Sequence, residues 1–311
     1  MTAIIPKVLA IFAMIAMGYA VRRCGLVRGD LQKPLAALLL NVNIPCMLIY
    51  SITQRELDGA LWAVTVQMLG WSCVYFVAAV FTAVPLAAAL RYGSERQEGA
   101  VQAVFATSNA GFMGFPVAQM LFGGDVFYCM VLFNIVMNFY LYSVCIIRLG
   151  GGSAVQVIRP SGLKKMLNLC MISAAVSVIL LFAGIHLPQI VCSVMGPVGD
   201  ASIPMAMLMI GVQISDGHLL DQIRDKRILI LSLARMFLWP ALILFLARLL
   251  PAADPVRIVL VMGAALPPAS TISVLAASEG GDEALTGSGL VVTTALSVLS
   301  IPLFAVLIQG A

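Results

Sequence analysis

Long apolar stretches that are almost free of charge are the feature that most limits what this chain can become. Hydrophobic residues make up 61% of the 311 residues and charged residues only 10%, whereas about a quarter of a soluble globular domain is charged. A helix crosses a bilayer with roughly 20 apolar residues. The stretches lack the strict alternation of β-barrel strands. We therefore predict an all-α polytopic membrane protein with ten transmembrane helices, at residues 4–22, 34–52, 61–90, 99–121, 126–148, 165–185, 196–214, 228–249, 256–278 and 284–309.

A weak internal repeat divides the sequence into two halves. Residues 24–45 align with residues 183–204 at a shift of 159, and the same shift aligns Ser108-Asn109 with Pro267-Pro268. Five spans per half is an odd number, so the second half must enter the membrane from the opposite side, as in transporters with inverted repeats. We predict a first five-helix repeat at 1–148, a cytoplasmic linker at 149–163 and a second, inverted five-helix repeat at 164–311.

Basic residues are distributed unevenly over the predicted loops. With the N-terminus outside, the inward loops carry thirteen lysines and arginines and the outward segments carry four. Basic residues near span ends favour the cytoplasmic side. We therefore expect both termini outside and a multi-pass protein of the cell inner membrane. The modest net charge of +4 reflects this asymmetry and gives no support to a nucleic-acid partner.

Two spans contain segments that interrupt a regular helix. In the fourth span, Ser108-Asn109-Ala110-Gly111 is followed by Gly114 and Pro116, and in the ninth span Pro267-Pro268 removes two successive backbone donors. Backbone groups that are freed inside a bilayer must face a cavity, a ligand or other protein. The N-termini of half-helices would there offer N–H groups to an anion. We predict a substrate site near the midplane formed by Ser108, Asn109, Ala110, Gly111, Pro267, Pro268, Ala269, Asn43 and Asn138.

The second and seventh spans contain a matched pair of prolines, Pro45 and Pro204. We expect these two prolines to kink their helices rather than break them, whereas Gly111, Gly114 and Pro116 are expected to break the helix of the fourth span. Asparagines in hydrocarbon are unfavourable unless they hydrogen-bond across helices. Asn43, beside Pro45, is therefore expected either to bridge helices or to line the transport path.

Asp200 and Arg235 are the two candidates for a coupling role. Asp200 either caps a helix that starts at Gly196-Pro197 or carries a proton. Arg235 lies eight residues after Arg227. It either extends to the inner interface, as long basic side chains do, or pairs with Asp200 or with a substrate carboxylate.

Catalytic and metal-binding motifs are missing from the sequence. There is no HExxH, no Gly-x-Ser-x-Gly, no P-loop and no CxxC pair, and the two histidines are 32 residues apart. We predict a protein that is not an enzyme and that binds no cofactor and no metal.

Four motifs, in order along the chain, resemble those of the auxin efflux carrier family, which includes bacterial malate and malonate permeases and plant PIN exporters. They are Asn41-Val42-Asn43-Ile44-Pro45, Asn109-Ala110-Gly111-Phe112-Met113-Gly114-Phe115-Pro116, Gly199-Asp200-Ala201-Ser202-Ile203-Pro204 and Ala265-Leu266-Pro267-Pro268. The resemblance implies a bile acid symporter-like elevator fold in which the fourth and ninth helices cross as broken helices. It places Asn109 where an asparagine of the plant exporters meets the substrate carboxylate. Ser108 stands where those exporters have a proline.

The sequence therefore predicts a secondary active transporter of small organic anions, namely mono- or dicarboxylates such as malate, malonate or auxin-like acids. The expected partners are this anion, a proton or sodium ion as coupling ion, the lipid bilayer and a second copy in a homodimer. The expected driving force is a proton gradient, a sodium gradient or the membrane potential alone. The alternatives are a bile acid/sodium symporter-like carrier and a transport-silent membrane binding or sensor protein.

The predicted orientation can be tested by cysteine accessibility. In Val155→Cys, the new thiol lies in the predicted cytoplasmic linker, so an impermeant maleimide should label it only after the membrane is opened. Labelling of residue 155 in sealed, right-side-out vesicles would reverse the predicted topology.

Overall fold

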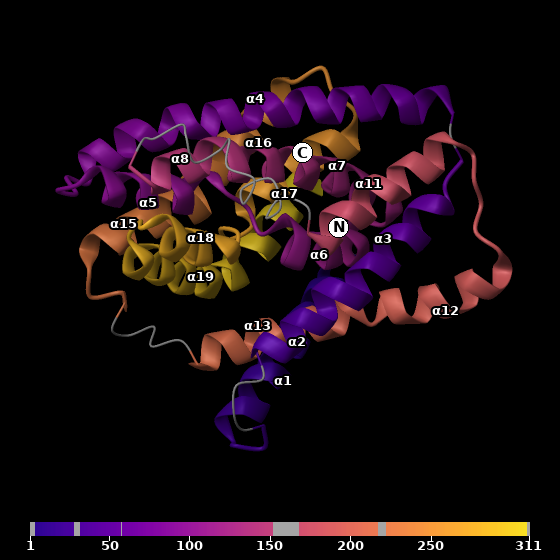
Figure 1. The fold of residues 1–311 in the computed structure, drawn as a ribbon, viewed down its shortest axis with the longest axis horizontal. Coiled ribbons are helices and arrows are strands. Elements are labelled where there is room, and N and C mark those ends of the chain that lie inside the picture. Colours follow the sequence, from indigo (N-terminus) through magenta and orange to yellow (C-terminus); the bar gives the residue numbers. More distant parts are fainter. Residues whose placement is uncertain (1–3, 28–31, 57, 152–167, 217–221, 310–311) are drawn as a thin grey trace.

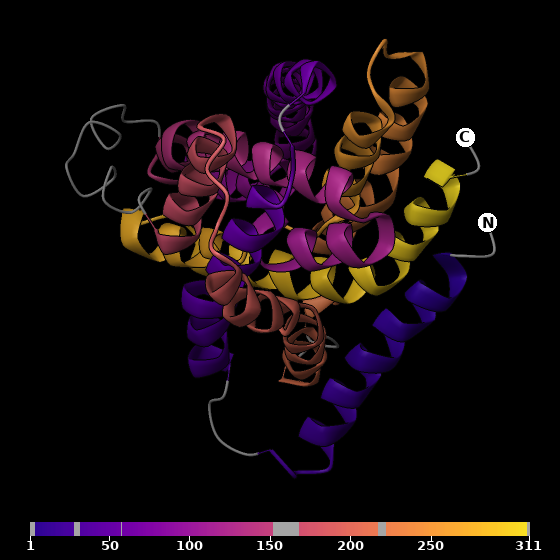
Figure 2. The same ribbon diagram turned by 90° about the vertical axis from the view of Figure 1, so that its right-hand side faces the viewer.

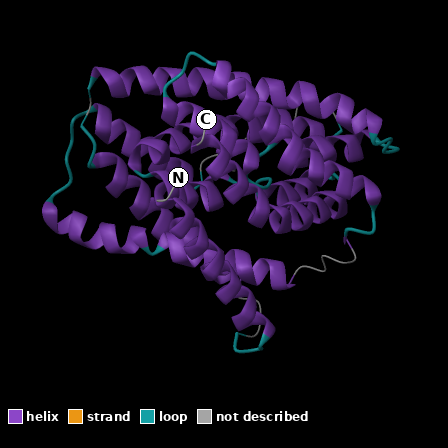
Figure 3. Ribbon diagram, turned by 180° about the vertical axis from the view of Figure 1, so that it is seen from behind, coloured by secondary structure: helices purple, strands orange, loops and turns teal. Residues whose placement is uncertain are grey.

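The computed structural model describes residues 4–27, 32–56, 58–151, 168–216 and 222–309. These residues form helices joined by short loops, with no strand among them (Figure 3). Most of the predicted linker at 149–163 lies outside the described residues. Seven helices within the described ranges are long and apolar enough to cross a membrane. The prediction of an all-α polytopic membrane protein is thereby confirmed.

The first half of the chain begins with the long helix α1 (Figure 1). It ends in α7, η3 and α8, which follow one another without a loop. Its elements are α1 (Ile4–Arg23), α2 (Gln32–Leu38), the π-helical turn η1 (Leu39–Asn43), α3 (Ile44–Thr53), α4 (Gly59–Ala89), α5 (Glu95–Ala106), the π-helical turn η2 (Ala110–Gly114), α6 (Phe115–Phe122), α7 (Gly124–Tyr140), the π-helical turn η3 (Leu141–Cys145) and α8 (Ile146–Leu149).

The second half runs from a short apolar helix to the long C-terminal one. Its elements are α11 (Leu169–Phe182), α12 (Gln189–Asp200), α13 (Ser202–Asp216), α15 (Lys226–Leu233), the π-helical turn η4 (Ala234–Leu238), α16 (Trp239–Leu249), α17 (Asp254–Ala265), α18 (Thr271–Glu279) and α19 (Glu283–Gln309). The predicted spans at 99–121, 165–185 and 256–278 correspond to shorter helices, namely α5 with α6, α11, and α17 with α18.

Prolines determine where several helices change their winding. Pro45, Pro116 and Pro240 each stand two residues after a π-helical turn, at the second position of the next α-helix. A proline has no N–H for the carbonyl one turn earlier, and the π turn accommodates that missing bond. Pro45 therefore changes the winding without interrupting the chain of helical residues. The break of the fourth span lies at residues 107–109 and not at Gly114 and Pro116, which are part of the helical residues 110–122.

The seventh predicted span differs from expectation. Its helical residues run from Gln189 to Asp216 and divide at Ala201, between α12 and α13. Pro204 provides no N–H for the carbonyl of Asp200, so the division falls one turn before the proline. The expected helix start at Gly196-Pro197 is wrong, because α12 begins after Pro188 and contains Pro197 in its interior.

Helix contacts separate the described helices into two groups. In the first helix group, α1 packs along α13, and α3 packs on α11 and α12; α2 belongs to the same group. The second helix group consists of α4 to α8 and α15 to α19, with α7, α17 and α19 at its centre. Contacts between the groups are few by comparison. Figure 1 shows α1, α2, α12 and α13 at one edge and α4 at the opposite edge, and Figure 2 shows the start of α1 and the end of α19 on the same side.

Glycines allow the backbones of α1 and α13 to touch. A Cβ added to Gly18 would lie 2.0 Å from the carbonyl oxygen of Leu208, and one added to Gly211 would lie 2.1 Å from that of Ile15. Small residues at helix interfaces allow such close approach in membranes. The first helix group therefore depends on these two glycines for its tightest contact.

Gly18→Ala should lower the thermal unfolding temperature of the purified protein, because overpacking against backbone destabilises by about 1–3 kcal/mol. Gly70→Ala is the matched control: no atom lies within 4 Å of its added Cβ, and alanine is the better helix former by about 1 kcal/mol. Equal unfolding temperatures for the two variants would contradict the described packing of α1 on α13.

Candidate functional site

Two interrupted helices meet at the centre of the second helix group. Helix α5 ends at Ala106 and α17 ends at Ala265. After each of these ends the backbone continues in extended conformation. The N–H of Asn109 donates to the carbonyl of Pro267 at 2.8 Å, and the N–H of Ala269 donates to Oγ1 of Thr107 at 3.3 Å. The chain resumes as helix at Ala110 and at Thr271. The interruptions expected from the sequence are thus present and face each other.

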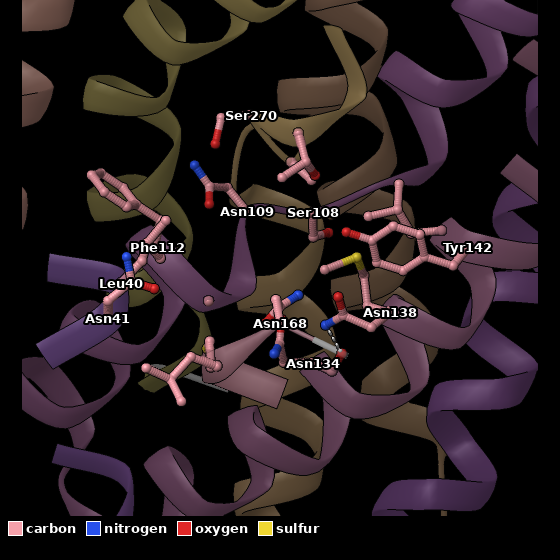
Figure 4. A pocket seen from close by; sticks show the side chains of 17 residues that line it. Leu40, Asn41, Ser108, Asn109, Phe112, Asn134, Asn138, Tyr142, Asn168 and Ser270 are labelled. Carbon is pink, nitrogen blue, oxygen red and sulfur yellow. Dashed lines mark hydrogen bonds between the residues drawn. The ribbon is translucent and has the colours of Figure 1, made fainter. Parts of the chain in front are cut away.

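A pocket of about 240 Å³ opens beside this crossing (Figure 4). Both helix groups contribute to it. The first group provides residues of η1 and of the start of α11, and the second provides the two interruptions and one face of α7 and η3. The lining residues are Leu40, Asn41, Ser108, Asn109, Gly111, Phe112, Asn134, Met137, Asn138, Leu141, Tyr142, Asn168, Leu169, Cys170, Ala269, Ser270 and Thr271.

Carboxamides supply most of the polarity of this pocket. Asn41, Asn109, Asn134, Asn138 and Asn168 surround one space. Asn134 is only 2% exposed, and its carboxamide has no hydrogen-bond partner among the described residues, so its donors and acceptor are available to a ligand. Asn138 donates from Nδ2 to the backbone oxygen of Asn134 at 2.7 Å. No Asp, Glu, Lys, Arg or His occurs among the described lining residues.

Helix N-termini give the pocket its electrostatic character. The first turns of η2 with α6 and of α18 begin at the pocket, where Gly111 and Thr271 line it. The first N–H groups of a helix have no partner within the helix, and the N-terminal end carries about half a positive charge. Two such ends beside uncharged carboxamides favour a small anion. Leu40, Phe112 and Met137 add an apolar wall.

Arg235 lies buried behind the crossing. It is 0% exposed. Its Nη1 donates to the carbonyl of Ala264, and its Nη2 donates to the carbonyl of Thr107 at 2.9 Å and to Oγ of Ser108 at 3.1 Å. The expectation that Arg235 extends to the inner interface is wrong, because the carbonyls at the ends of α5 and α17 hold it inside the protein.

Asp200 is not part of this arrangement. It is exposed, stands at the last position of α12 and is not among the pocket residues. Its expected pairing with Arg235 is also wrong, because the guanidinium binds backbone oxygens instead. The geometry therefore separates the acid from both the pocket and the buried cation.

The remaining predicted site residues divide into lining and supporting positions. Ser108, Asn109, Gly111, Asn138 and Ala269 line the pocket. Ala110, Pro267 and Pro268 are buried at the crossing without lining it. Asn43 is 6% exposed and donates from Nδ2 to the carbonyl of Val198 at 2.9 Å, so it bridges η1 to α12.

Several lining residues were not selected from the sequence. Asn134 lies four residues before the selected Asn138, a spacing that places both on one helix face, and this could have identified it. Asn41 belongs to the proline motif of the second span, whose asparagines were expected either to bridge helices or to line the path. Asn168 lies at the start of α11, and no sequence signal brings it to the pocket. The described residues contain no group of three or more His, Cys, Asp or Glu that could hold a metal ion.

A pocket at the crossing of broken helices, in a polytopic bundle, is typical of membrane transporters. Comparison with known proteins agrees: the membrane transport protein family matches residues 3–168 and 151–305. The chain therefore belongs to this family, the auxin efflux carrier family of membrane transport proteins.

Two relatives support the same assignment. An uncharacterized transporter of Methanothermobacter thermautotrophicus is 21% identical over 303 residues, which cover 97% of each chain. An uncharacterized transporter of Methanocaldococcus jannaschii is 22% identical over 307 residues, which cover 96% of each chain.

The separation of Asp200 from the pocket leads to a prediction about pH. Asp200→Asn should leave the rate and the pH profile of substrate uptake unchanged, because an exposed carboxylate outside the pocket does not contact the anion. Uptake into proteoliposomes across a series of pH values measures this. A shifted profile in the variant would restore Asp200 as the proton carrier.

Proposed function

We propose that this protein is a secondary active transporter of small organic anions, mono- or dicarboxylates, and that it has no catalytic activity. The observation that supports this most is the pocket at the crossing, where two helix N-termini and five carboxamides surround one space. Membership of a transporter family supports the same class.

The pocket chemistry matches a carboxylate. Carboxylate oxygens accept hydrogen bonds, and the pocket offers the N–H groups of two first turns and the Nδ2 atoms of its asparagines. Donors that are already oriented make binding more favourable, because little conformational entropy is lost when the anion binds. The uncharged lining lets the anion leave again, whereas a buried ion pair would hold it more firmly.

The two helix groups suggest how access could alternate. The pocket lies between them: Leu40, Asn41 and Asn168 come from the first group, and Asn109, Asn134 and Asn138 from the second. We propose that the second group carries the bound anion past the first, in the manner of an elevator, within two inverted five-helix repeats. The few contacts between the groups are consistent with sliding at this border.

The rival functions differ in the binding sites that they require and in whether the anion accumulates. A sodium symporter-like carrier needs an oxygen-rich cation site near the anion, and the described pocket lining contains no carboxylate. A sensor would bind the anion without accumulating it. Uptake of labelled carboxylates into proteoliposomes separates accumulation from binding, and a change of sodium gradient separates the two carriers.

Asn109→Ala should weaken binding of the transported carboxylate by about 1–3 kcal/mol, the usual penalty when a polar partner is left unsatisfied. Binding is measured by titration calorimetry on the purified protein and transport by uptake into proteoliposomes. Asn43→Ala is the matched control, because Asn43 is buried outside the pocket and bonds to Val198. This control should lower stability while leaving the binding constant unchanged.

The opposite pattern would contradict the proposed site. If Asn109→Ala binds and transports as the parent does, while Asn43→Ala loses binding, the anion does not bind at the crossing.

A further inference from the structure

Arg235 lies where the ends of two half-helices converge. Helices α5 and α17 both end beside its guanidinium, which contacts the carbonyls of Thr107, Ala264 and Gly263, the last at 3.4 Å. The side chain comes from the π-helical turn η4 on a different helix. Three separate segments of the second helix group therefore meet at one buried cation.

The charges at this place balance. Each helix C-terminus carries about half a negative charge, so the ends of α5 and α17 together amount to about one. No Asp or Glu forms an ion pair with Arg235 among the described residues. The single positive charge of the guanidinium therefore faces backbone oxygens and the hydroxyl of Ser108.

A sodium ion would require the same surroundings. Sodium-coupled transporters with broken helices bind the ion through unwound backbone carbonyls and half-helix C-terminal ends. Here those carbonyls, together with Oγ of Ser108, already bind the guanidinium. Since Arg235 is fully buried and permanently charged, no vacancy is left among these oxygens for a free cation.

Ser108 connects the guanidinium of Arg235 to the anion pocket. Oγ of Ser108 donates to the carbonyl of Gly263 at 2.6 Å and accepts from Nη2 of Arg235. Ser108 precedes Asn109, whose side chain lines the pocket (Figure 4). The guanidinium therefore holds the backbone that orients the proposed anion-binding amide.

We propose that Arg235 is a built-in cation that takes the place of a coupling sodium ion, so that anion transport by this protein is independent of sodium. The inference rests on the proposed transport function of the adjoining pocket. In it Arg235 is a positioning residue: it holds the crossing together and does not touch the anion.

The first experiment compares uptake by the parent protein in sodium chloride and in choline chloride at equal concentration. Equal rates are expected, with or without a sodium gradient. Uptake that requires sodium would overturn the inference while leaving the proposed transport function intact. Absence of uptake for every carboxylate tested would instead contradict the transport function, and the second experiment would still test the role of Arg235.

The second experiment opens the cation site. Arg235→Ala should reduce uptake on the order of a hundredfold, because a buried charged donor is lost from a bonded cluster. It leaves the carbonyl oxygens facing an opening large enough for a small cation. Guanidinium at sub-denaturing concentration, or sodium in place of choline, should then raise both the unfolding temperature and the uptake of this variant. Neither should affect the parent in this way.

Two further variants complete the test. Arg248→Ala removes an exposed arginine from α16, outside the crossing, and should respond as the parent does. Arg235→Met fills the space without a charge and should not be restored by either cation. A folded Arg235→Ala protein that responds to neither cation would overturn the inference; if it does not fold, the comparison of sodium with choline on the parent decides.

Discussion

Backbone carbonyl oxygens that lose their helical partners inside a membrane protein must find donors within the protein, and at the centre of this chain Arg235 supplies them. Helices α5 and α17 both stop there, and their carbonyls bind one guanidinium. The unpaired alternative is unfavourable by several kcal/mol for each group in hydrocarbon. The backbone bond between Asn109 and Pro267 completes the connection. The remaining features of the site follow from this crossing.

One consequence is a separation of charge across the crossing. The C-terminal ends of the half-helices face Arg235, while the N-terminal ends of η2 and α18 face the pocket. The positive side chain thus lies behind the pocket and outside its lining. The pocket remains uncharged and still favours an anion, because partial charges of backbone groups and neutral carboxamides provide the attraction.

A second consequence concerns the border between the helix groups. The crossing is bonded entirely within the second group, whereas Asn41 and Asn168 reach the pocket from the first. The first group is held by direct backbone contact at Gly18 and Gly211. Each group therefore has its own internal support, and the pocket lies at the surface where they meet.

Local chemistry made the helices and their interruptions predictable. Apolar stretches of membrane-spanning length indicated the helices, and Pro267-Pro268 and the segment from Ser108 to Pro116 indicated the two interrupted spans, because prolines and glycines act on the backbone of their own segment. The family followed from motifs of the same kind and is confirmed. The division of the chain into inverted repeats and the orientation of the termini stay predictions.

Side-chain partners depended on the tertiary structure. Arg235 and Asp200 were both coupling candidates from the sequence, yet one lies fully buried on carbonyls from α5 and α17 and the other is exposed at the end of α12. Asn43 bridges helices, while Asn41, two residues earlier, lines the pocket. The hydropathy of a segment shows that it is a membrane helix, but which face of it meets a cavity is set by the packing of distant helices against it.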